Sequence, residues 1–366
     1  MKRVLLPAEV KSLLLVEMTR LGDVVSMLPA IRLFRSQFPS AEIHLFVDQR
    51  YTALLRGFDV GVNVEGIRTS TRISGFLSAL ARARRLRVDL ACSMSPTKRN
   101  ALLALASGAR YKAGYLLPAN SMTPHLSTSP VEAIGFALQT QTRYGMENIE
   151  TRATKICAAM GFQEEMPGAV FDMAKAAPSL ARQRLTTAGI IPSRRYVVIH
   201  PFAGWEHRMW SIHNFNSLVK HIVERLEYDV LLICSEEEAY ALQPSRVMFQ
   251  KDSRVRFFPS RDLLESAVVI HGASLFIGND SGPLHLAAAL RIKTVGLFGP
   301  APPELTAPLN ASGTFIYRRV ECSPCAQTSC IRPGNSCMDL ISPDEAFAAV
   351  VKSLSLVSID AMVVNG

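Results

Sequence analysis

The sequence has 366 residues, which is enough for two domains of typical size and too many for one ordinary hydrophobic core. Hydrophobic residues make up 48% of the chain and charged residues 19%, proportions that exclude a disordered polypeptide. No apolar run is long enough to span a bilayer, and the stretch from Met1 to Val10 lacks the apolar segment and cleavage site of a signal peptide. We therefore expect a folded cytoplasmic protein.

The formal net charge of +9 favours an anionic partner, such as nucleic acid, anionic lipid or a phosphorylated sugar. The chain has no dense lysine and arginine tail, and no segment interleaves basic and aromatic residues as in proteins that bind single strands. We therefore predict a phosphorylated substrate or a membrane surface as the partner, and no nucleic acid.

The first half of the sequence alternates apolar strands with amphipathic helices. Ser12 to Val16 is a continuous apolar run, which is typical of a strand buried on both faces. A helix is expected from Asp23 to Phe38, where Pro39 ends it, and a second strand from Ile43 to Val47. Further helix and strand candidates are Ile73 to Leu86, Val88 to Ser93 and Arg99 to Ser107. Strands separated by helices predict parallel pairing with right-handed crossovers.

The same alternation starts again after a stretch, residues 163–178, that is rich in Gly, Pro and Ala and has weak periodicity. The second set of strands and helices is Tyr196 to Ile199, His213 to Leu226, Val230 to Ile233, Leu275 to Ile277, Pro283 to Leu290 and Thr294 to Phe298. We predict an N-terminal domain at residues 1–172, a linker at 173–192 and a C-terminal domain at 193–366. Both should be doubly wound α/β domains with parallel sheets, whose ligands bind beyond the carboxyl ends of the strands.

The strongest local signal is a short polar turn that follows one predicted strand and opens a helix. Its residues are Asp280, Ser281, Gly282, Pro283 and His285. Proline suits the first helical position, and the free amide groups of such a helix start bind phosphate with the help of the helix dipole. The Asp280 carboxylate can only accept hydrogen bonds, so it suits sugar hydroxyls instead. The structural alternative is an ordinary N-cap in which Asp280 or Ser281 bonds the first turn.

A second candidate segment, Arg20 to Asp23, follows the first predicted strand. It lacks the glycine pattern of a dinucleotide-binding turn. A carboxylate at the exit of a strand would face a bound substrate, so Asp23 is a candidate general base that removes the proton of an attacking hydroxyl. The structural alternative is an aspartate that caps the following helix.

A third segment follows the first strand of the C-terminal domain. It contains Ala203 and Gly204, of which Gly204 allows a ligand to approach the backbone, and Arg208 offers a fork of donors to a diphosphate. The alternative for Arg208 is an ordinary surface cation, with Trp210 as a core aromatic. Glu236 to Glu238 follow the next strand, where a carboxylate can hold ribose hydroxyls or form the acidic first turn of a helix.

Four of the seven cysteines fall within residues 322–337, a looped segment that we call the cysteine knuckle. They are Cys322, Cys325, Cys330 and Cys337. This density predicts a structural site in which four thiolates hold zinc or iron, although the spacing differs from that of the usual paired motif. Disulfides need an oxidising compartment, which nothing else in the chain indicates. The other three cysteines lie in apolar contexts typical of core thiols: Cys92, Cys157 and Cys234.

Basic residues gather in the first domain, at Arg82, Arg84, Arg85, Arg87, Lys98 and Arg99. They are either a solvated helix face or a docking surface for an anionic acceptor or a membrane leaflet. Charge pattern alone does not separate these two interpretations.

Taken in order, these segments resemble glycosyltransferase family 9, the bacterial heptosyltransferases. The resemblance covers most of the chain and rests on LLLVEMTRLGDVVSMLPAIRLFRSQFP, HPFAGWEHRMW, IGNDSGPLHLAAAL and VGLFGP. The pattern CSPC followed by two further cysteines and ISPDEAFAAV is also similar to many members. It implies a GT-B fold, in which two Rossmann-like domains face each other across a cleft, and inverting transfer without a catalytic metal.

The resemblance also implies roles for the residues. Asp23 would be the catalytic base, Asp280 would contact the donor sugar, and Arg208 would lie near the phosphates. The turn at Ser281, Gly282, Pro283 and His285 would surround the diphosphate, and Glu236 or a neighbour would bind the ribose. The implied donor is ADP-heptose. The implied acceptor is an anionic glycolipid of the lipopolysaccharide inner core, reached by Arg20, Lys98 and Arg99 at the cytoplasmic face of the inner membrane.

Several alternatives stay open at this point. Ala203 and Gly204 stand where some relatives have two threonines, which leaves a donor with another nucleotide or sugar as an alternative. A protein acceptor is a further alternative. A different class of function is a non-catalytic regulatory or scaffold protein that binds metal on a degenerate transferase fold. An NAD(P)-dependent oxidoreductase is disfavoured, because the glycine fingerprint is missing.

Overall fold

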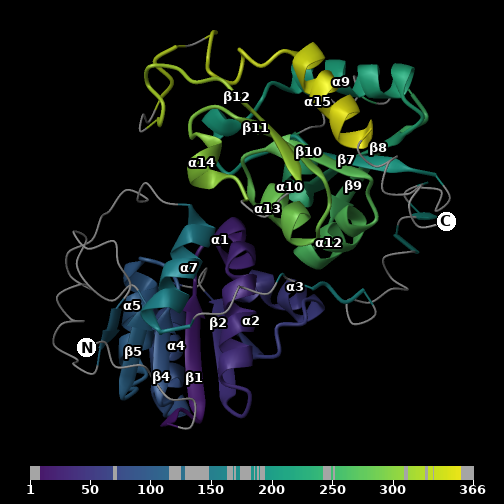
Figure 1. The fold of residues 1–366 in the computed structure, drawn as a ribbon. Coiled ribbons are helices and arrows are strands. Elements are labelled where there is room, and N and C mark those ends of the chain that lie inside the picture. The colour runs from purple at the N-terminus through teal and green to yellow at the C-terminus, as the bar shows by residue number, and fades with distance from the viewer. Residues whose placement is uncertain are drawn as a thin grey trace, which may run out of the picture. The chain divides into compact units, whose positions relative to one another are not determined.

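The computed structural model divides into two compact units, Met1–Asp172 and Met173–Gly366 (Figure 1). It describes residues 9–68, 72–114, 125–127, 148–162, 168, 170–173, 183–184, 186–187, 189, 194–241, 249, 252–308, 312–325, 329–332 and 334–355. Most of the predicted linker at 173–192 lies outside these residues and is grouped with the second unit. Among the described residues, no helix has the length and apolar character needed to cross a membrane.

The first unit contains a six-stranded sheet in the order β3-β2-β1-β4-β5-β6. Its strands are β1 (Ser12–Glu17), β2 (Glu42–Asp48), β3 (Asn63–Ile67), β4 (Leu90–Ser93), β5 (Tyr111–Gly114) and β6 (His125–Ser127). The predicted parallel, doubly wound sheet is confirmed, with one exception: the short strand β6 pairs antiparallel with β5 at the edge.

Helices cover both faces of this sheet (Figure 1). They are α1 (Leu21–Ser26), α2 (Leu28–Gln37), α3 (Thr52–Gly57), α4 (Arg72–Leu86), α5 (Lys98–Ala106) and α7 (Ile149–Ala159), with a short 3-10 turn, η2 (Gln49–Tyr51). Alternate side chains of β1 pack against α4 and α5. Leu14 and Val16 of β1 share a core cluster with Ala83 of α4 and Leu103 of α5. Helices α1, α2 and α7 contact one another. Because β1 is buried on both faces, its sequence is continuously apolar.

The single helix predicted from Asp23 to Phe38 is wrong, because the chain forms two helices that meet at Met27. Pro29 explains the break. It lies in the first turn of α2 and has no N–H to donate to a preceding helical carbonyl, so α1 cannot continue through it. The six residues expected on the inner side of this segment are all buried: Val24, Val25, Leu28, Ile31, Leu33 and Phe34.

The second unit contains a fully parallel six-stranded sheet in the order β12-β11-β10-β7-β8-β9. Its strands are β7 (Tyr196–His200), β8 (Asp229–Ser235), β9 (Val255–Ser260), β10 (Leu275–Asn279), β11 (Thr294–Phe298) and β12 (Gly313–Tyr317). Its helices are η3 (Glu206–Arg208), α9 (Ile212–Arg225), α10 (Glu236–Ala241), α12 (Leu263–His271), α13 (Gly282–Ala289), α14 (Pro303–Thr306) and α15 (Pro343–Ser355). Helices α9 and α15 pack together, and their apolar faces close one large core cluster with the sheet.

Both sheets have the same strand order, and it reverses direction once in each. In the first unit the reversal lies between β1 and β4, and in the second between β7 and β10. The loops that leave these neighbouring strands diverge to opposite sides, and ligands of doubly wound sheets bind at the crevice that results. The residues that follow β1, β4, β7 and β10 are therefore the ones to inspect for function.

Candidate functional site

The turn between β10 and α13 has the features of a phosphate site. Ser281 is the N-cap of α13 in an extended conformation, with φ −151° and ψ 164°, yet its side chain makes no capping hydrogen bond. Its Oγ is buried and has no hydrogen-bond partner within the described structure. The ordinary N-cap considered above is therefore not what Ser281 forms. A buried hydroxyl and the open amides of a helix start together suit an anionic oxygen.

Asp280 and Arg208 come together at this turn from two different strands. Arg208 Nη1 lies 3.0 Å from Asp280 Oδ2, and the Thr306 hydroxyl donates to the same oxygen at 3.0 Å. The Asp280 side chain is 5% exposed and that of Arg208 is 26% exposed. Arg208 Nε is buried without a hydrogen-bond partner among the described residues. The guanidinium therefore keeps donor capacity for a ligand while Asp280 fixes its orientation.

His285 lies on the first turn of α13 and is almost fully buried. Burial lowers the pKa of His285 to about 4, with a further contribution from the nearby Arg208 charge. The imidazole is thus neutral near pH 7. It can take part in a hydrogen bond near a phosphate but supplies no positive charge there.

The loop that carries Arg208 is held by the fully buried Asn279 at the end of β10. Asn279 Oδ1 accepts from the Trp210 amide at 3.0 Å, and its Nδ2 donates to the Pro201 carbonyl at 2.8 Å. Trp210 is itself 2% exposed, and its indole donates to the Ile341 carbonyl at 2.9 Å, so Trp210 is the core aromatic that the alternative interpretation described. Arg208 follows in the 3-10 turn η3, with its guanidinium 6.0 Å from the centre of the Trp205 ring.

The remaining candidate donor residues also follow β7 and β8. Ala203 and Gly204 lie in the loop after β7, and a Cβ added at Gly204 would meet no atom within 4 Å, so there is room beside this backbone. Glu238 is engaged: it forms a reciprocal cap with Ser235 and lies 3.5 Å from His200. Glu236 is exposed at the start of α10, which makes it, rather than Glu238, available to a ligand.

Asp23 lies in the first turn of α1, the helix that follows β1, and is 4% exposed. Its Oδ1 is 3.3 Å from Nη2 of Arg152, which projects from α7 and is also buried. Burial raises the pKa of Asp23, while Arg152 and hydrogen bonds from Thr19 and the Arg20 backbone oppose this. A carboxylate with a raised pKa is a stronger base than an exposed one, as a proton acceptor requires.

The three candidate acceptor-binding cations lie, like Asp23, beyond the carboxyl ends of the strands of the first sheet. Arg20 precedes α1, and Lys98 and Arg99 begin α5 just after β4. All three are exposed. The loops after β1 and β4 are joined by the fully buried Asn100, whose Oδ1 accepts from the Met18 amide at 3.0 Å.

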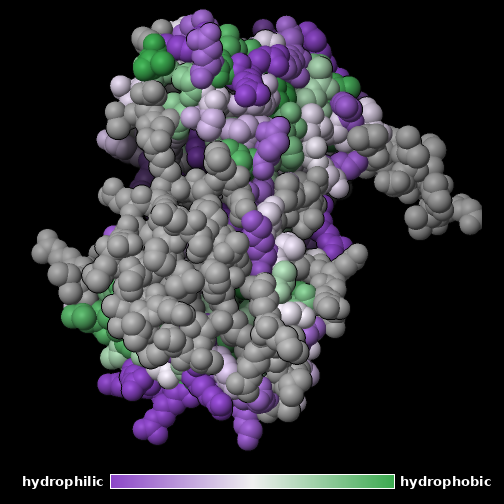
Figure 2. Space-filling model, turned by 60° about the vertical axis from the view of Figure 1, so that its left-hand side comes forward, coloured by the Kyte–Doolittle hydropathy of each residue, from purple (hydrophilic) through white to green (hydrophobic). Residues whose placement is uncertain are grey.

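The basic residues of α4 and Arg87 lie toward the amino ends of the strands of the first unit, opposite to the carboxyl ends where Asp23 lies. Helix α4 leads through Arg87 into the amino end of β4, so Arg84, Arg85 and Arg87 lie away from Asp23. Arg82 pairs with Glu65 at 2.5 Å. Figure 2 shows hydrophilic side chains gathered over the amino ends of these strands, at the lower end of the view. These exposed arginines therefore lie apart from the candidate site.

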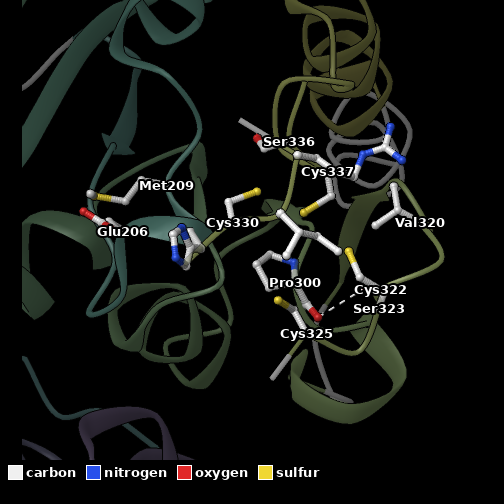
Figure 3. A pocket seen from close by; sticks show the side chains of 13 residues that line it. Glu206, Met209, Pro300, Val320, Cys322, Ser323, Cys325, Cys330, Ser336 and Cys337 are labelled. Atoms are coloured by element: carbon white, nitrogen blue, oxygen red, sulfur yellow. Dashed lines mark hydrogen bonds between the residues drawn. The ribbon is translucent and has the colours of Figure 1, made fainter. Parts of the chain in front are cut away.

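The cysteine knuckle packs against the carboxyl end of β11. The Cys325 amide donates to the Pro300 carbonyl at 2.7 Å, and the knuckle side chains with Glu206 and Met209 line a cavity of about 110 Å³. Figure 3 shows the sulfur atoms of all four knuckle cysteines around this cavity. Within the described residues, however, no three His, Cys, Asp or Glu side chains converge enough to hold a metal ion as they stand. None of the seven cysteines, all of them described, forms a disulfide, and the predicted core thiols are confirmed as buried: Cys92, Cys157 and Cys234.

Comparison with known proteins shows the family of this chain. The sequence pattern that defines glycosyltransferase family 9 (heptosyltransferase) matches residues 82–335, which is more than half of the chain. The chain belongs to glycosyltransferase family 9. Family membership makes it a glycosyltransferase and confirms the resemblance found in its sequence.

Relatives of this family 9 member are heptosyltransferases and related transferases. A putative glycosyltransferase of Haemophilus influenzae is 22% identical over 354 residues, covering 93% of this chain and 96% of the relative. Lipopolysaccharide heptosyltransferase 3 of Escherichia coli is 24% identical over 298 residues, covering 76% and 79%. The match to lipooligosaccharide heptosyltransferase 2 of Campylobacter jejuni has 39% identity over 72 residues, and spans 19% of this chain and 23% of that protein.

Solved structures confirm the GT-B fold of this family 9 chain. A family 9 glycosyltransferase of Veillonella parvula superposes with a TM-score of 0.75 at 17% identity, covering 94% of this chain and 97% of the other. An E. coli ADP-heptose lipopolysaccharide heptosyltransferase II gives 0.70 at 16% identity, covering 95% and 99%. TibC, an iron-containing dodecameric glycosyltransferase of enterotoxigenic E. coli, gives 0.56 at 16% identity, covering 95% and 77%.

Sequence reasoning missed several polar residues at these edges, above all Glu17, Asn100 and Arg152. Glu17 carried a signal, because an acidic residue ends an otherwise apolar buried strand. Arg152 carried none, since it is 129 residues away from Asp23 in the chain and only the fold brings the two together.

Proposed function

We propose that this chain is an inverting heptosyltransferase that moves a heptose from ADP-heptose to a hydroxyl of the lipopolysaccharide inner core. The observation that carries the proposal is the turn at Ser281, where a buried unpartnered hydroxyl and the start of α13 adjoin Arg208. This set of donors suits the diphosphate of a nucleotide sugar. The solved E. coli ADP-heptose heptosyltransferase of the same fold supports ADP-heptose as that donor.

The proposed reaction is a single displacement. The Asp23 carboxylate removes the proton of the acceptor hydroxyl while that oxygen bonds to the anomeric carbon of the donor. The bond from this carbon to the phosphate oxygen breaks, and the nucleoside diphosphate leaves with the bonding electrons. Its developing charge is stabilised by the amides of α13, Ser281 and Arg208, and one lost contact of this kind costs on the order of 3 kcal/mol in the transition state. The neutral His285 acts as a hydrogen-bonding partner beside them.

The other donor contacts follow from position. Asp280 would meet the sugar hydroxyls at the turn where its carboxylate also holds Arg208 and Thr306. The open backbone at Ala203 and Gly204 leaves room for the diphosphate, and Glu236 is the carboxylate nearest the end of β8 that is free to meet a ribose.

We assign acceptor binding to the exposed cations Arg20, Lys98 and Arg99, because they share an edge with Asp23 and would attract an anionic glycolipid. With a net charge of +9, the chain would work at the cytoplasmic face of the inner membrane as a peripheral protein. The arginines of α4, at the far edge, are not needed for this role.

Release of nucleotide tests the donor assignment. Purified protein is mixed with a lipopolysaccharide-core acceptor and, in separate reactions, with ADP-heptose or UDP-sugars. We expect ADP release that depends on the acceptor and no comparable release of UDP. Turnover with a UDP-sugar alone would show that the enzyme uses another donor, and no turnover with any donor would favour the scaffold alternative.

We also propose that the four cysteines of the knuckle bind one structural zinc or iron ion. Four thiols around one cavity are a suitable donor set, and the iron-containing TibC shares the fold. Burial raises the pKa of Cys337, so its metal-free thiol stays protonated, and binding would release protons. The ion would stabilise the looped knuckle and take no part in the transfer, whose base and phosphate contacts lie elsewhere.

Cys325→Ser is therefore expected to lower the melting temperature and metal content while the folded fraction keeps most of its turnover. Loss of one thiolate weakens a site that contributes to folding. Metal analysis, thiol titration and thermal melting measure this, with Cys234→Ser, a buried thiol outside the knuckle, as the matched control. Metal-free protein with four freely reactive thiols and unaltered melting of Cys325→Ser would contradict the proposal.

A further inference from the structure

A second buried carboxyl group lies beside the proposed base. Glu17 is the last residue of β1 and is fully buried, six positions before Asp23. The proposed mechanism does not use it. A carboxyl group is rarely buried unless it is paired, so its surroundings call for an explanation.

Hydrogen bonds hold the Glu17 carboxyl in one place. The Ser95 hydroxyl, just beyond β4, donates to Oε2 at 2.5 Å, and the Thr19 amide donates to Oε1 at 3.2 Å. The Thr19 hydroxyl also donates to Oε1. Thr19 is a hydrogen-bonding partner of Asp23 as well, so this one side chain links the two carboxyl groups. The loops after β1 and β4 thus meet on Glu17.

The charges facing this pair do not balance if both carboxyls are ionised. Within the described part of the chain, the cation that acts on both is Arg152 from α7, and its contact is with Asp23 Oδ1 at 3.3 Å. The thiols of Cys92 and Cys157 are buried nearby, and burial raises the pKa of each, so they add no charge. Burial, and then the charge of Asp23, raises the pKa of Glu17 to about 7. One guanidinium therefore serves two buried carboxyl groups, and the one it contacts is Asp23.

We propose that Glu17 is a positioning residue for the transfer reaction, whose buried protonated carboxyl orders the loops after β1 and β4 and leaves Arg152 to Asp23 alone. The inference rests on the proposed role of Asp23 as base. While Glu17 holds its proton, Asp23 is the ionised member of the pair and takes the acceptor proton. When Glu17 ionises, a second negative charge competes for Arg152 and disturbs the position of Asp23.

Glu17→Gln tests this, because glutamine imitates the protonated acid but cannot ionise. We expect kcat/KM of the wild type to fall as the pH rises through about 7, and this fall to be absent in Glu17→Gln. At pH 6 the kcat/KM of Glu17→Gln should be less than about tenfold below that of the wild type. Removal of a general base would lower it much more. Ser95→Ala removes a hydrogen bond that favours the ionised acid, so it should move the fall to higher pH. Glu65→Gln, in β3 of the same sheet, is the matched control and should keep the wild-type profile.

Stability gives a readout that does not depend on activity. The folded pKa of Glu17 lies above the ordinary value of 4.5, so the folded protein holds a proton that the unfolded chain releases. The contribution of Glu17 to the free energy of unfolding is fully present below pH 4.5 and is lost as the pH rises through about 7. We therefore expect the melting temperature of Glu17→Gln, relative to the wild type, to be higher at pH 8 than at pH 5, by ~5 °C.

These outcomes separate the two proposals. A wild-type pH profile retained in Glu17→Gln, or a melting difference that does not change with pH, would overturn the inference. A kcat/KM more than a hundredfold below the wild type at every pH, in folded Glu17→Gln, would also overturn it, because Glu17 would then be the base. Near-normal turnover of Asp23→Asn, with the pH-dependent melting difference of Glu17→Gln still present, would instead overturn the proposed role of Asp23.

Discussion

Asp23→Asn is expected to fold and to lose glycosyl transfer by roughly two to four orders of magnitude, the range for a lost general base. Asparagine keeps the shape of the side chain and an oxygen that faces Arg152, but it cannot accept the acceptor proton. The loss should appear in kcat, with donor binding retained, because the diphosphate contacts belong to the other unit. Single-turnover kinetics with separate titration of the donor measure both quantities.

The control for this variant is Asp89→Asn. Asp89 accepts hydrogen bonds from the Lys11 and Ser12 amides at the amino end of β1, so the same substitution is made at the opposite edge of the same sheet. It should lower stability and leave the turnover of folded protein near normal. Because Asp23 must be ionised to act, wild-type kcat should also decrease as the pH falls through its raised pKa. Near-normal kcat of Asp23→Asn would exclude Asp23 as the base.

Arg208→Ala is expected to weaken donor use on the order of a hundredfold, since a preorganised contact to the leaving diphosphate is lost. The variant also leaves Asp280 with the Thr306 hydroxyl but without its cation. Arg208→Lys should be intermediate, because lysine restores the charge without the guanidinium fork. The donor and acceptor are varied separately in steady-state kinetics, and the effect should fall on the donor constant and turnover.

His285→Ala should show a smaller effect of the same kind, because His285 is neutral near pH 7 and supplies no charge. Arg254→Ala provides the matched control for the arginine. Arg254 forms a comparable ion pair with Asp252, at 3.1 Å, but lies before the amino end of β9. Unchanged donor constants and turnover in both Arg208→Ala and His285→Ala would contradict the assignment of this turn to the diphosphate.

Continuous apolar runs and abrupt polar turns made much of the fold predictable from the sequence. The central strands β1, β7, β10 and β11 are buried along most of their length, so their residues are almost all apolar. The edge strands β3, β9 and β12 were not predicted, because each is only partly buried and carries polar residues among apolar ones. The helix break at Met27 was missed because helical periodicity outweighed the signal of Pro29.

Single residues of the candidate site were predictable from the sequence, but their pairing was not. Asp23, Arg208 and Ser281 lie in the segments that follow β1, β7 and β10, so a rule about strand ends was enough to select these segments. The pairing of Arg208 with Asp280 was not predictable, because the two residues are 72 positions apart and meet only through the adjacency of β7 and β10. The same holds for Arg152 and Asp23, which come from α7 and α1.

The identity of the product tests the central proposal most directly. Purified protein is incubated with ADP-heptose and a lipopolysaccharide-core acceptor, and the acceptor is then analysed by mass spectrometry and by NMR of the new glycosidic bond. Asp23→Asn and Arg208→Ala are run in parallel. The account predicts an acceptor that gains one heptose with inverted anomeric configuration, formed by the wild type and not, or barely, by the two variants. An acceptor left unchanged by fully folded wild-type protein, or a product with retained configuration, would contradict it.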